Sequence, residues 1–204
     1  MITIIDYGLG NIGSITNALM LLKQSYQISS DPETINSAEA LLLPGVGAAG
    51  LGMKNIKQLG LDIVMRSAIN KGKPFLGICL GMQLLFEYSE EADTICMGIL
   101  KGSVKKFRKA QKIPQIGWNQ VIPLRTNSAA LRLFSGIPKS CSFYFVNSYY
   151  PLPQDPSLIA ATTEYGENFA SVIATKNIIA TQFHPEKSSR GGLQLLQNFI
   201  KEYL

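Results

Sequence analysis

The sequence is poor in the residues from which metal centres and disulfide frameworks are built. Its 204 residues contain three cysteines (Cys79, Cys96 and Cys141) and one histidine, His184. The cysteines are too few and too unevenly spaced for a disulfide scaffold, and no Cys-x-x-Cys pair is present to bind zinc. Metal sites built on several histidines are therefore excluded, and any reaction that needs an imidazole must use His184.

Long apolar runs and an export signal are also missing. No stretch of about 18 apolar residues occurs, so we expect no membrane-spanning helix. The first six residues, from Met1 to Asp6, have no basic region before their apolar residues, which predicts a first strand rather than a signal peptide. Without an export signal, the expected location is the reducing cytoplasm.

Charged residues make up only 16 % of the chain, against 46 % apolar residues, and the net charge is +5. This composition supplies a core and excludes wholesale disorder. The clearest basic segment is 101–112, which contains no acid. It suits a solvated face, docking to an acidic partner or phosphate steering. We expect no nucleic-acid binding, because no aromatic-rich RNA-binding signature accompanies the segment.

The first half of the chain alternates strand-like and helix-like segments. Short apolar runs predict strands over 2–5, 39–43 and 74–78. Apolar residues repeating every three or four positions predict helices over 14–24, 53–70 and 80–88. This alternation is typical of a parallel sheet covered by helices on both faces.

The second half is richer in β-branched and aromatic residues. Strands are predicted at Val121 and over 143–146, 158–163, 169–175 and 178–183, with a turn at 176–177 and a last helix over 192–203. We therefore predict one α/β domain over residues 1–204. Its sheet is mixed and mostly parallel, flanked by helices, with an antiparallel portion in the second half.

The segment from Gly8 to Gly13 spells the G-x-G-x-x-G pattern of a dinucleotide-binding turn, and Asp31 follows eighteen residues later. Two features argue against that function. Asp6 and Tyr7 lengthen the turn after the strand, and Asp31 precedes a proline in an apparent loop rather than at a strand end. We interpret the glycines as a sharp turn at the edge of a cleft, with dinucleotide binding as the alternative.

Cys79 lies at the junction of a predicted strand and a predicted helix, between Gly77 and Gly81. G-x-C-x-G is the thiol counterpart of the G-x-S-x-G nucleophile elbow. A helix N-terminus at this point favours the thiolate and offers N–H groups to an oxyanion. Cys96 and Cys141 lack such a context, and we interpret them as structural.

His184 and Glu186 follow a predicted strand and are separated by Pro185. In an extended segment their side chains point to the same side, so the carboxylate can orient the imidazole. Together with Cys79 they form a candidate nucleophilic triad. The turn 44–47 follows a neighbouring strand, so its backbone can aim an N–H group at the same site.

Segments spread over nearly the whole chain resemble the class I, or triad, glutamine amidotransferases. The elbow and the His-Pro-Glu segment are similar to the wider class, and two further segments resemble its glutaminase subunits of imidazole glycerol phosphate synthase. The resemblance implies a flavodoxin-like fold. The matching segments are 6–11, 43–47, 77–87, Pro114-Gln115-Ile116-Gly117-Trp118-Asn119, Tyr144-Phe145-Val146-Asn147-Ser148-Tyr149 and 180–188.

The resemblance implies a glutaminase that uses no metal or other cofactor. Cys79 would attack the side-chain amide of glutamine, His184 would move the protons and Glu186 would orient His184. The backbone N–H of Leu80 and, after a local rearrangement, that of Val46 would hold the oxyanion. The residues implied to grip the amino-acid part of glutamine are Gly47, Gln83, Glu91, Ser148 and Tyr149.

The resemblance also implies a partner, a (β/α)8-barrel cyclase subunit that forms a heterodimer with the glutaminase. Ammonia would pass to this barrel and serve histidine biosynthesis; no nucleic acid or membrane is implied. Pro114, Trp118, Tyr144 and Lys187 match positions near the interface. Core packing is the other interpretation for Trp118 and Tyr144, and a plain surface for Lys187.

Three residues at two places in the chain depart from the family pattern. Asn147 stands where the family usually has a histidine, and Ala48-Ala49 replace a bulkier pair. Such departures suit a paralogue that supplies ammonia to a sugar-modifying synthase for surface polysaccharide. The ammonia acceptor therefore stays open between a histidine-pathway intermediate and a sugar. A catalytically silent scaffold is a further alternative.

Overall fold

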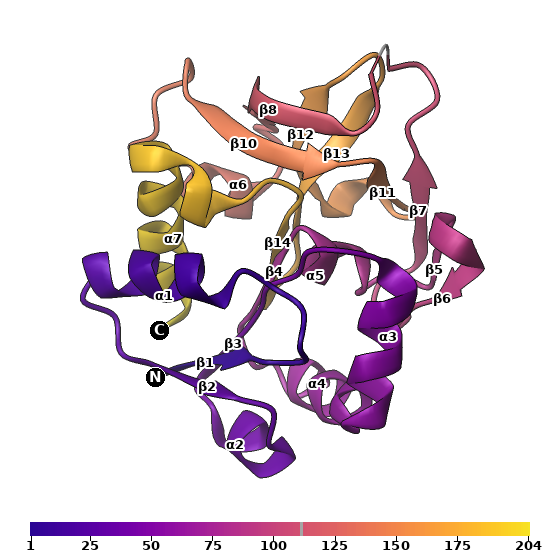
Figure 1. Ribbon diagram of the computed structural model, residues 1–204. Coiled ribbons are helices and arrows are strands. Elements are labelled where there is room, and N and C mark those ends of the chain that lie inside the picture. Colours follow the sequence, from indigo (N-terminus) through magenta and orange to yellow (C-terminus); the bar gives the residue numbers. More distant parts are fainter. Residues whose placement is uncertain (111) are drawn as a thin grey trace.

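An eight-stranded sheet runs through the middle of the molecule, in a computed structural model that describes residues 1–110 and 112–204 (Figure 1). In the spatial order given below, the first five strands are parallel to one another. Each of the last three strands is antiparallel to the strand before it. The predicted mixed, mostly parallel sheet is confirmed. In spatial order the strands are β2 (Tyr26–Ser29), β1 (Ile2–Ile5), β3 (Ala40–Leu43), β4 (Phe75–Ile78), β14 (Ile178–Thr181), β13 (Asn168–Ala174), β12 (Ile159–Glu164) and β9 (Ile122–Pro123).

Helices cover both faces of this sheet (Figure 1). On one face lie α3 (Ala49–Gln58), α4 (Leu61–Asn70) and the one-turn α5 (Leu80–Gln83), and on the other α1 (Ile12–Leu21), α6 (Ser128–Leu133) and α7 (Ser189–Tyr203). No helix of the described chain combines the length and the apolar character that crossing a bilayer requires.

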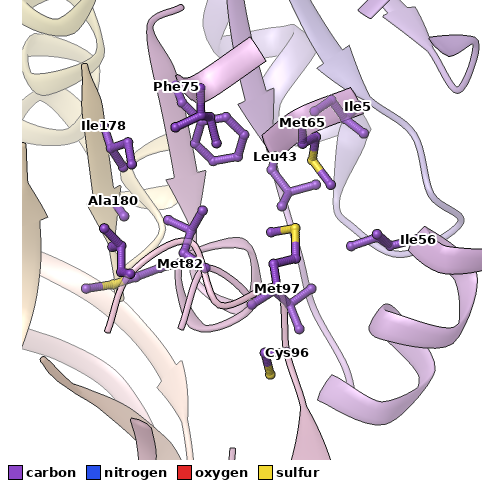
Figure 2. Close-up of a cluster of buried hydrophobic side chains, with 14 of the residues drawn as sticks. Ile5, Leu43, Ile56, Met65, Phe75, Met82, Cys96, Met97, Ile178 and Ala180 are labelled. Carbon is purple, nitrogen blue, oxygen red and sulfur yellow. The ribbon is translucent and has the colours of Figure 1, made fainter. Parts of the chain in front are cut away.

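Successive side chains of the central strands point to opposite faces of the sheet and so belong to two separate hydrophobic cores. Leu43 of β3 packs with Met65 of α4 in the core drawn in Figure 2. Its neighbour Leu42 packs on the opposite side, in the core that includes Ile15 of α1 and Phe199 of α7. Burying each large apolar side chain contributes about 1.5–3 kcal/mol. The sheet is therefore clamped from both faces, which fixes the position of the loops at its edge.

Two smaller sheets stand at the carboxyl ends of the parallel strands. One pairs β8 (Gln115–Gln120) antiparallel with β10 (Ser142–Asn147), and the other has the order β11-β7-β5-β6. Since β11 begins at Tyr149, only Ser148 separates it from β10, and the two small sheets meet there. The remaining elements are α2 (Pro32–Ser37), β5 (Tyr88–Ser89), η1 (Glu91–Asp93), β6 (Thr94–Ile95), β7 (Gly102–Lys106), β11 (Tyr149–Pro153), η2 (Pro156–Leu158) and η3 (Pro185–Lys187).

Two predicted helices are wrong in extent. The helix predicted over 53–70 is divided into α3 and α4 at Gly60, whose φ of +66° is left-handed and ends a helix. The helix predicted over 80–88 is reduced to α5, because the chain beyond it no longer continues helical hydrogen bonding. Instead, backbone N–H groups of residues 97–100 donate to the carbonyls of residues 84–86.

Other differences follow from short or polar elements. The predicted helix 14–24 is displaced to α1, because Asn11 caps it by accepting a hydrogen bond from the Ser14 N–H at 3.2 Å. Val121 lies between β8 and β9 rather than within a strand. The edge strand β2, the short α2 and the polar β8 were not predicted, because none of them contains a continuous apolar run.

The basic segment 101–112 is partly paired in the fold, so it is not a uniformly solvated cationic face. Lys105 Nζ and Arg108 Nη2 lie 3.1 and 3.3 Å from a carboxylate oxygen of Glu90. The backbone N–H of Arg108 also donates to Glu167 at 2.9 Å. Two acids from other parts of the chain therefore offset some of its charge. Residue 111 of the segment lies outside the described residues.

Candidate active site

Cys79 sits on a sharp turn between β4 and α5. Its φ of +54° and ψ of −108° form a conformation that non-glycine residues rarely adopt, at a cost of about 1–3 kcal/mol. The Cys79 N–H donates to the Thr181 carbonyl at 2.7 Å, which ties the turn to β14. A Cβ on Gly77 would lie 2.9 Å from the Gly81 carbonyl oxygen, and one on Gly81 would overlap the Leu43 carbonyl. The flanking glycines are therefore required for this elbow.

The structure brings His184 and Glu186 to the same place as Cys79. His184 Nδ1 lies 2.8 Å from Glu186 Oε1, and the imidazole and the Cys79 sulfur line the same cavity, close enough for the sulfur to influence the ring. Both side chains of the His–Glu pair are almost completely buried. Glu186 Oε2 has no hydrogen-bond partner in the described part of the chain, so His184 is the main counter-charge of this carboxylate.

Backbone contacts hold His184 in position. Its N–H donates to the Tyr144 carbonyl at 2.9 Å, which links the residue to β10. The Ser188 hydroxyl donates to the His184 carbonyl at 2.6 Å and accepts from the Tyr144 N–H at 2.9 Å. These hydrogen bonds fix the backbone N–H and the carbonyl of His184, independently of the contacts that its ring makes.

The charge on His184 depends on its neighbours. Burial lowers the pKa of the imidazole, but the charge and hydrogen bond of the Cys79 sulfur, together with those of Glu186, outweigh it. They raise the pKa from 6.5 to about 10. An imidazolium beside the sulfur favours the reactive thiolate.

The single histidine makes this pairing measurable by NMR. We expect its ring C–H resonances to titrate with a midpoint near pH 10. Cys79→Ala should lower the midpoint, because it removes the sulfur's charge and hydrogen bond, while Cys141→Ala should not. Since the folded-state pKa is raised, the group's contribution to stability is full below about pH 6.5 and is lost as the pH rises toward about 10. An identical midpoint in wild type and Cys79→Ala would contradict the pairing.

A cavity of about 330 Å³ opens beside Cys79 and His184. This volume is at the lower end of the range for small-molecule sites. All the residues implied to bind glutamine or the oxyanion line it, although they come from four separate segments of the chain. They are Val46, Gly47, Leu80, Gln83, Glu91, Ser148 and Tyr149, with Pro114, Val146 and Asn147 beside them.

Gln182 is a site residue that the sequence analysis did not single out. Its Nε2 lies 3.6 Å from the Cys79 sulfur, and its Oε1 accepts a hydrogen bond from Gln83 Nε2 at 3.0 Å. Gln83 Nε2 also donates to the Tyr149 carbonyl at 3.1 Å. The fully buried Gln182 therefore offers the sulfur a donor that stabilises a thiolate. A polar residue at the end of an otherwise apolar strand was the available signal.

Glu91 has a structural contact in addition to its place on the cavity wall. Its Oε2 accepts a hydrogen bond from the Ala49 N–H at 2.7 Å, at the first turn of α3. The preceding residue, Ala48, has no side chain that can cap this helix. Glu91 supplies the missing cap, so one of its two oxygens is already used in the fold.

The two implied oxyanion donors are arranged differently from a finished oxyanion hole. The Leu80 N–H points at the Gly45 carbonyl, with a donor–acceptor distance of 3.4 Å. That carbonyl stands where a substrate oxyanion would have to lie. In addition, α5 has only four residues, so the helix dipole expected at Cys79 is weak. The stabilisation of a thiolate comes instead from His184 and Gln182.

Comparison with known proteins gives a consistent result. The family described as glutamine amidotransferase class-I matches residues 3–203. The chain belongs to the class I glutamine amidotransferase family. It is therefore an enzyme of the amidotransferase class, and the interpretation as a dinucleotide-binding module is not supported.

Relatives within this amidotransferase family match almost end to end. The "imidazole glycerol phosphate synthase subunit HisH" of Dehalococcoides mccartyi is 49 % identical over 202 residues, covering 98 % of this chain and 97 % of the relative. "Imidazole glycerol phosphate synthase subunit HisH 1" of Methanococcus maripaludis is 48 % identical over 205 residues, covering 98 % and 99 %. Each of these two relatives is named as a subunit of a synthase.

Solved structures support the amidotransferase fold. "PurLQS from Thermotoga maritima" aligns with a TM-score of 0.72 at 18 % identity, covering 98 % of this chain and 97 % of that chain. A glutamine amidotransferase from the same organism gives 0.65 at 18 % identity, covering 98 % and 82 %. At these identities the likeness concerns the fold alone.

The glycine-rich loop of this amidotransferase has a structural explanation. A Cβ on Gly10 would lie 3.1 Å from the Pro44 ring, so the loop packs on the turn that leads into the cavity. Asp31, the candidate ribose ligand, caps α2 instead, because its Oδ2 accepts from the Thr34 N–H at 2.8 Å. The pattern therefore shapes the cavity edge, and its acid is used in a helix cap.

The other two cysteines are separated from the chemistry. Cys96 lies in the core drawn in Figure 2, and burial raises its pKa to about 11. Cys141 is half-buried near the start of β10, and burial raises its pKa as well. Neither lines the cavity beside His184.

The four residues matched to a partner interface do not share one environment. Trp118 is 56 % exposed, so the core interpretation of this residue is excluded. Tyr144 stacks edge-on against it with ring centroids 6.0 Å apart. Pro114 lines the cavity, and Lys187 lies in η3 next to the triad. Together they run from the cavity onto the outer face of β8 and β10.

Proposed function

We propose that this chain is the glutaminase subunit of an imidazole glycerol phosphate synthase, with residues 1–204 as one amidotransferase domain. It hydrolyses glutamine to glutamate and ammonia and passes the ammonia to a cyclase subunit in histidine biosynthesis. The observation that carries the proposal is that Cys79 and His184 meet at a cavity lined by every implied glutamine ligand, with Glu186 hydrogen-bonded to the histidine. The names of the HisH relatives point to the same reaction.

The triad supports a two-stage hydrolysis. The Cys79 sulfur attacks the side-chain carbonyl carbon of glutamine, and His184 transfers the thiol proton to the nitrogen, which leaves as ammonia. Water then attacks the thioester, His184 accepts a proton from it, and glutamate leaves as the thiol is restored. Glu186 keeps the imidazole oriented through both stages and stabilises the imidazolium each time it forms.

The resting geometry suits activation by a partner. While the Gly45 carbonyl faces the Leu80 N–H, this donor is not free for the oxyanion. Rotation of the peptide between Gly45 and Val46 would free Leu80 and aim the Val46 N–H at the same point. Removing one oxyanion donor costs roughly 10²–10³ in rate, so the subunit would be slow until a partner favours the rotated form.

The proposed partner is a (β/α)8-barrel cyclase that docks on the outer face of β8 and β10. The strand register places Trp118 opposite Tyr144 and Ile116 opposite Val146, with all four on the outward side. Ile116 is 61 % exposed, so the face presents aliphatic and aromatic surface next to the cavity. A patch of this kind is typical of a protein interface.

The decisive test combines genetics with an assay. We expect the chain to restore histidine-independent growth to a bacterium that lacks its own glutaminase subunit. In this test the chain is co-expressed with the cyclase subunit whose gene lies next to its own. In vitro, adding the cyclase should raise glutamine hydrolysis by roughly 10²-fold or more, because it completes the oxyanion hole. The paralogue would be favoured instead by two results together. Growth would still require added histidine, and a sugar-modifying synthase would be the partner that stimulates glutamine hydrolysis.

A further inference from the structure

One buried amide in the cavity has an acceptor that no described residue satisfies. Asn147 is 6 % exposed and lines the cavity together with Cys79 and His184. Its Nδ2 donates to the Tyr149 carbonyl at 3.0 Å, but its Oδ1 has no hydrogen-bond partner within residues 1–110 and 112–204. Since the Tyr149 carbonyl can only accept, this bond fixes which end of the amide is the nitrogen. The unpaired atom is therefore the oxygen.

The residue opposite Asn147 does not pair with it. Gln115 is directly opposite in the β8–β10 ladder, and both side chains are on the inward face. Gln115 is itself buried and has an unpaired Oε1. Among the described residues, both amide oxygens at the inner end of this ladder therefore stay unpaired, although burying an unpaired acceptor is unfavourable. A ligand with N–H groups would satisfy them.

The reaction produces such a ligand at this point. When Cys79 forms a bond to the side-chain carbon of glutamine, the carbon–nitrogen bond breaks and the nitrogen takes the thiol proton through His184. The ammonia that leaves carries three N–H donors. The Val146 carbonyl, which faces the Cys79 sulfur at 3.8 Å, loses its S–H donor once the thiol is deprotonated. Val146 and Asn147 are adjacent, so two acceptors are open beside the breaking bond.

We propose that Asn147 Oδ1 accepts a hydrogen bond from the glutamine nitrogen as the carbon–nitrogen bond breaks, with the Val146 carbonyl as a second acceptor. Asn147 is then a further catalytic residue that receives the leaving group. The inference rests on the proposed glutaminase function. It is also compatible with the histidine that the resemblance implies at this position, because an asparagine amide and a neutral imidazole each carry a donor group and an acceptor group.

The test compares two matched variants, each in complex with the cyclase. Asn147→Leu has a similar volume and removes both the donor and the acceptor, whereas Asn147→His retains one of each. We expect Asn147→Leu to lower kcat for glutamine by about tenfold, with KM changed less than about twofold, and Asn147→His to restore most of the loss. Asn147→Ala carries the same expectation as Asn147→Leu and replaces it if that variant does not fold.

A second substrate separates leaving-group binding from general damage. Glutamate γ-methyl ester forms the same thioester but has no N–H group at the breaking bond, so Asn147→Leu should lower its turnover by less than about twofold. Equal losses on ester and amide, or unchanged glutamine turnover in Asn147→Leu, would overturn the inference. If the unsubstituted complex does not hydrolyse glutamine, the proposed function fails instead.

Discussion

Cys79→Ala is expected to lower glutamine hydrolysis by about 10⁴-fold or more, the largest effect on activity of any change considered. The sulfur is the only nucleophile that contacts His184 in the described structure, and the thioester cannot form without it. The measurement is glutamate release in the presence of the cyclase subunit. Binding of the cyclase should be unchanged, because the elbow lies below the outer face of β8 and β10.

Cys141→Ala is the matched control for this variant. Cys141 is half-buried and does not line the cavity, so its loss should change turnover by less than about twofold. An electrophilic glutamine analogue should label Cys79 alone, as mass spectrometry of digested protein can establish. Labelling at Cys96 or Cys141, or appreciable turnover by Cys79→Ala, would refute the assignment and leave a scaffold that only docks.

Gly81→Ala is expected to have the largest effect on stability. A Cβ at this position would overlap the Leu43 backbone carbonyl of β3, and neither α5 nor β3 can move without disturbing the central sheet. Overpacking against backbone costs about 3 kcal/mol or more. The free energy of unfolding, measured by urea denaturation with circular dichroism, should fall by that amount, and hydrolysis should fall with it.

Gly13→Ala provides the comparison at a helical glycine. No atom lies within 4 Å of a Cβ built on Gly13, which is in the first turn of α1 and has ordinary helical backbone. Alanine there should leave stability unchanged or raise it by about 0.5–1 kcal/mol. Similar losses in Gly13→Ala and Gly81→Ala would mean that general glycine effects, rather than the close approach of α5 to β3, explain the result.

The parts of the fold that the sequence predicted are those with strong local signals. The central strands are short and completely buried, so their sequences are nearly continuous apolar runs that can be recognised. The elbow was recognisable because only glycine fits at Gly77 and Gly81. The contact of His184 with Glu186 was predicted from an extended segment. The structure makes this contact differently, because Glu186 lies in the 3-10 helix η3 that begins directly after His184.

The remaining features depend on contacts between distant segments. α5 ends after one turn because residues 97–100 bind the carbonyls of residues 84–86, which would have continued the helix, and nothing within 80–88 signals this. Gln182 meets Cys79 across 103 positions of sequence, and Glu91 caps a helix that begins 42 residues earlier. The strand β8 alternates polar and exposed apolar residues, a pattern that becomes clear only once β10 pairs with it.

Two residues of strand β10 have side chains on the outer surface and backbone carbonyls at the active site. Tyr144 and Val146 turn their side chains outward, yet the carbonyl of Tyr144 holds the His184 N–H and that of Val146 faces the Cys79 sulfur. Pressure from a docked subunit on these two side chains would therefore reach the reacting atoms through one peptide unit each. If the proposed partner docks on this face, communication between the subunits needs no long relay, because the strand it touches also binds the backbone of His184.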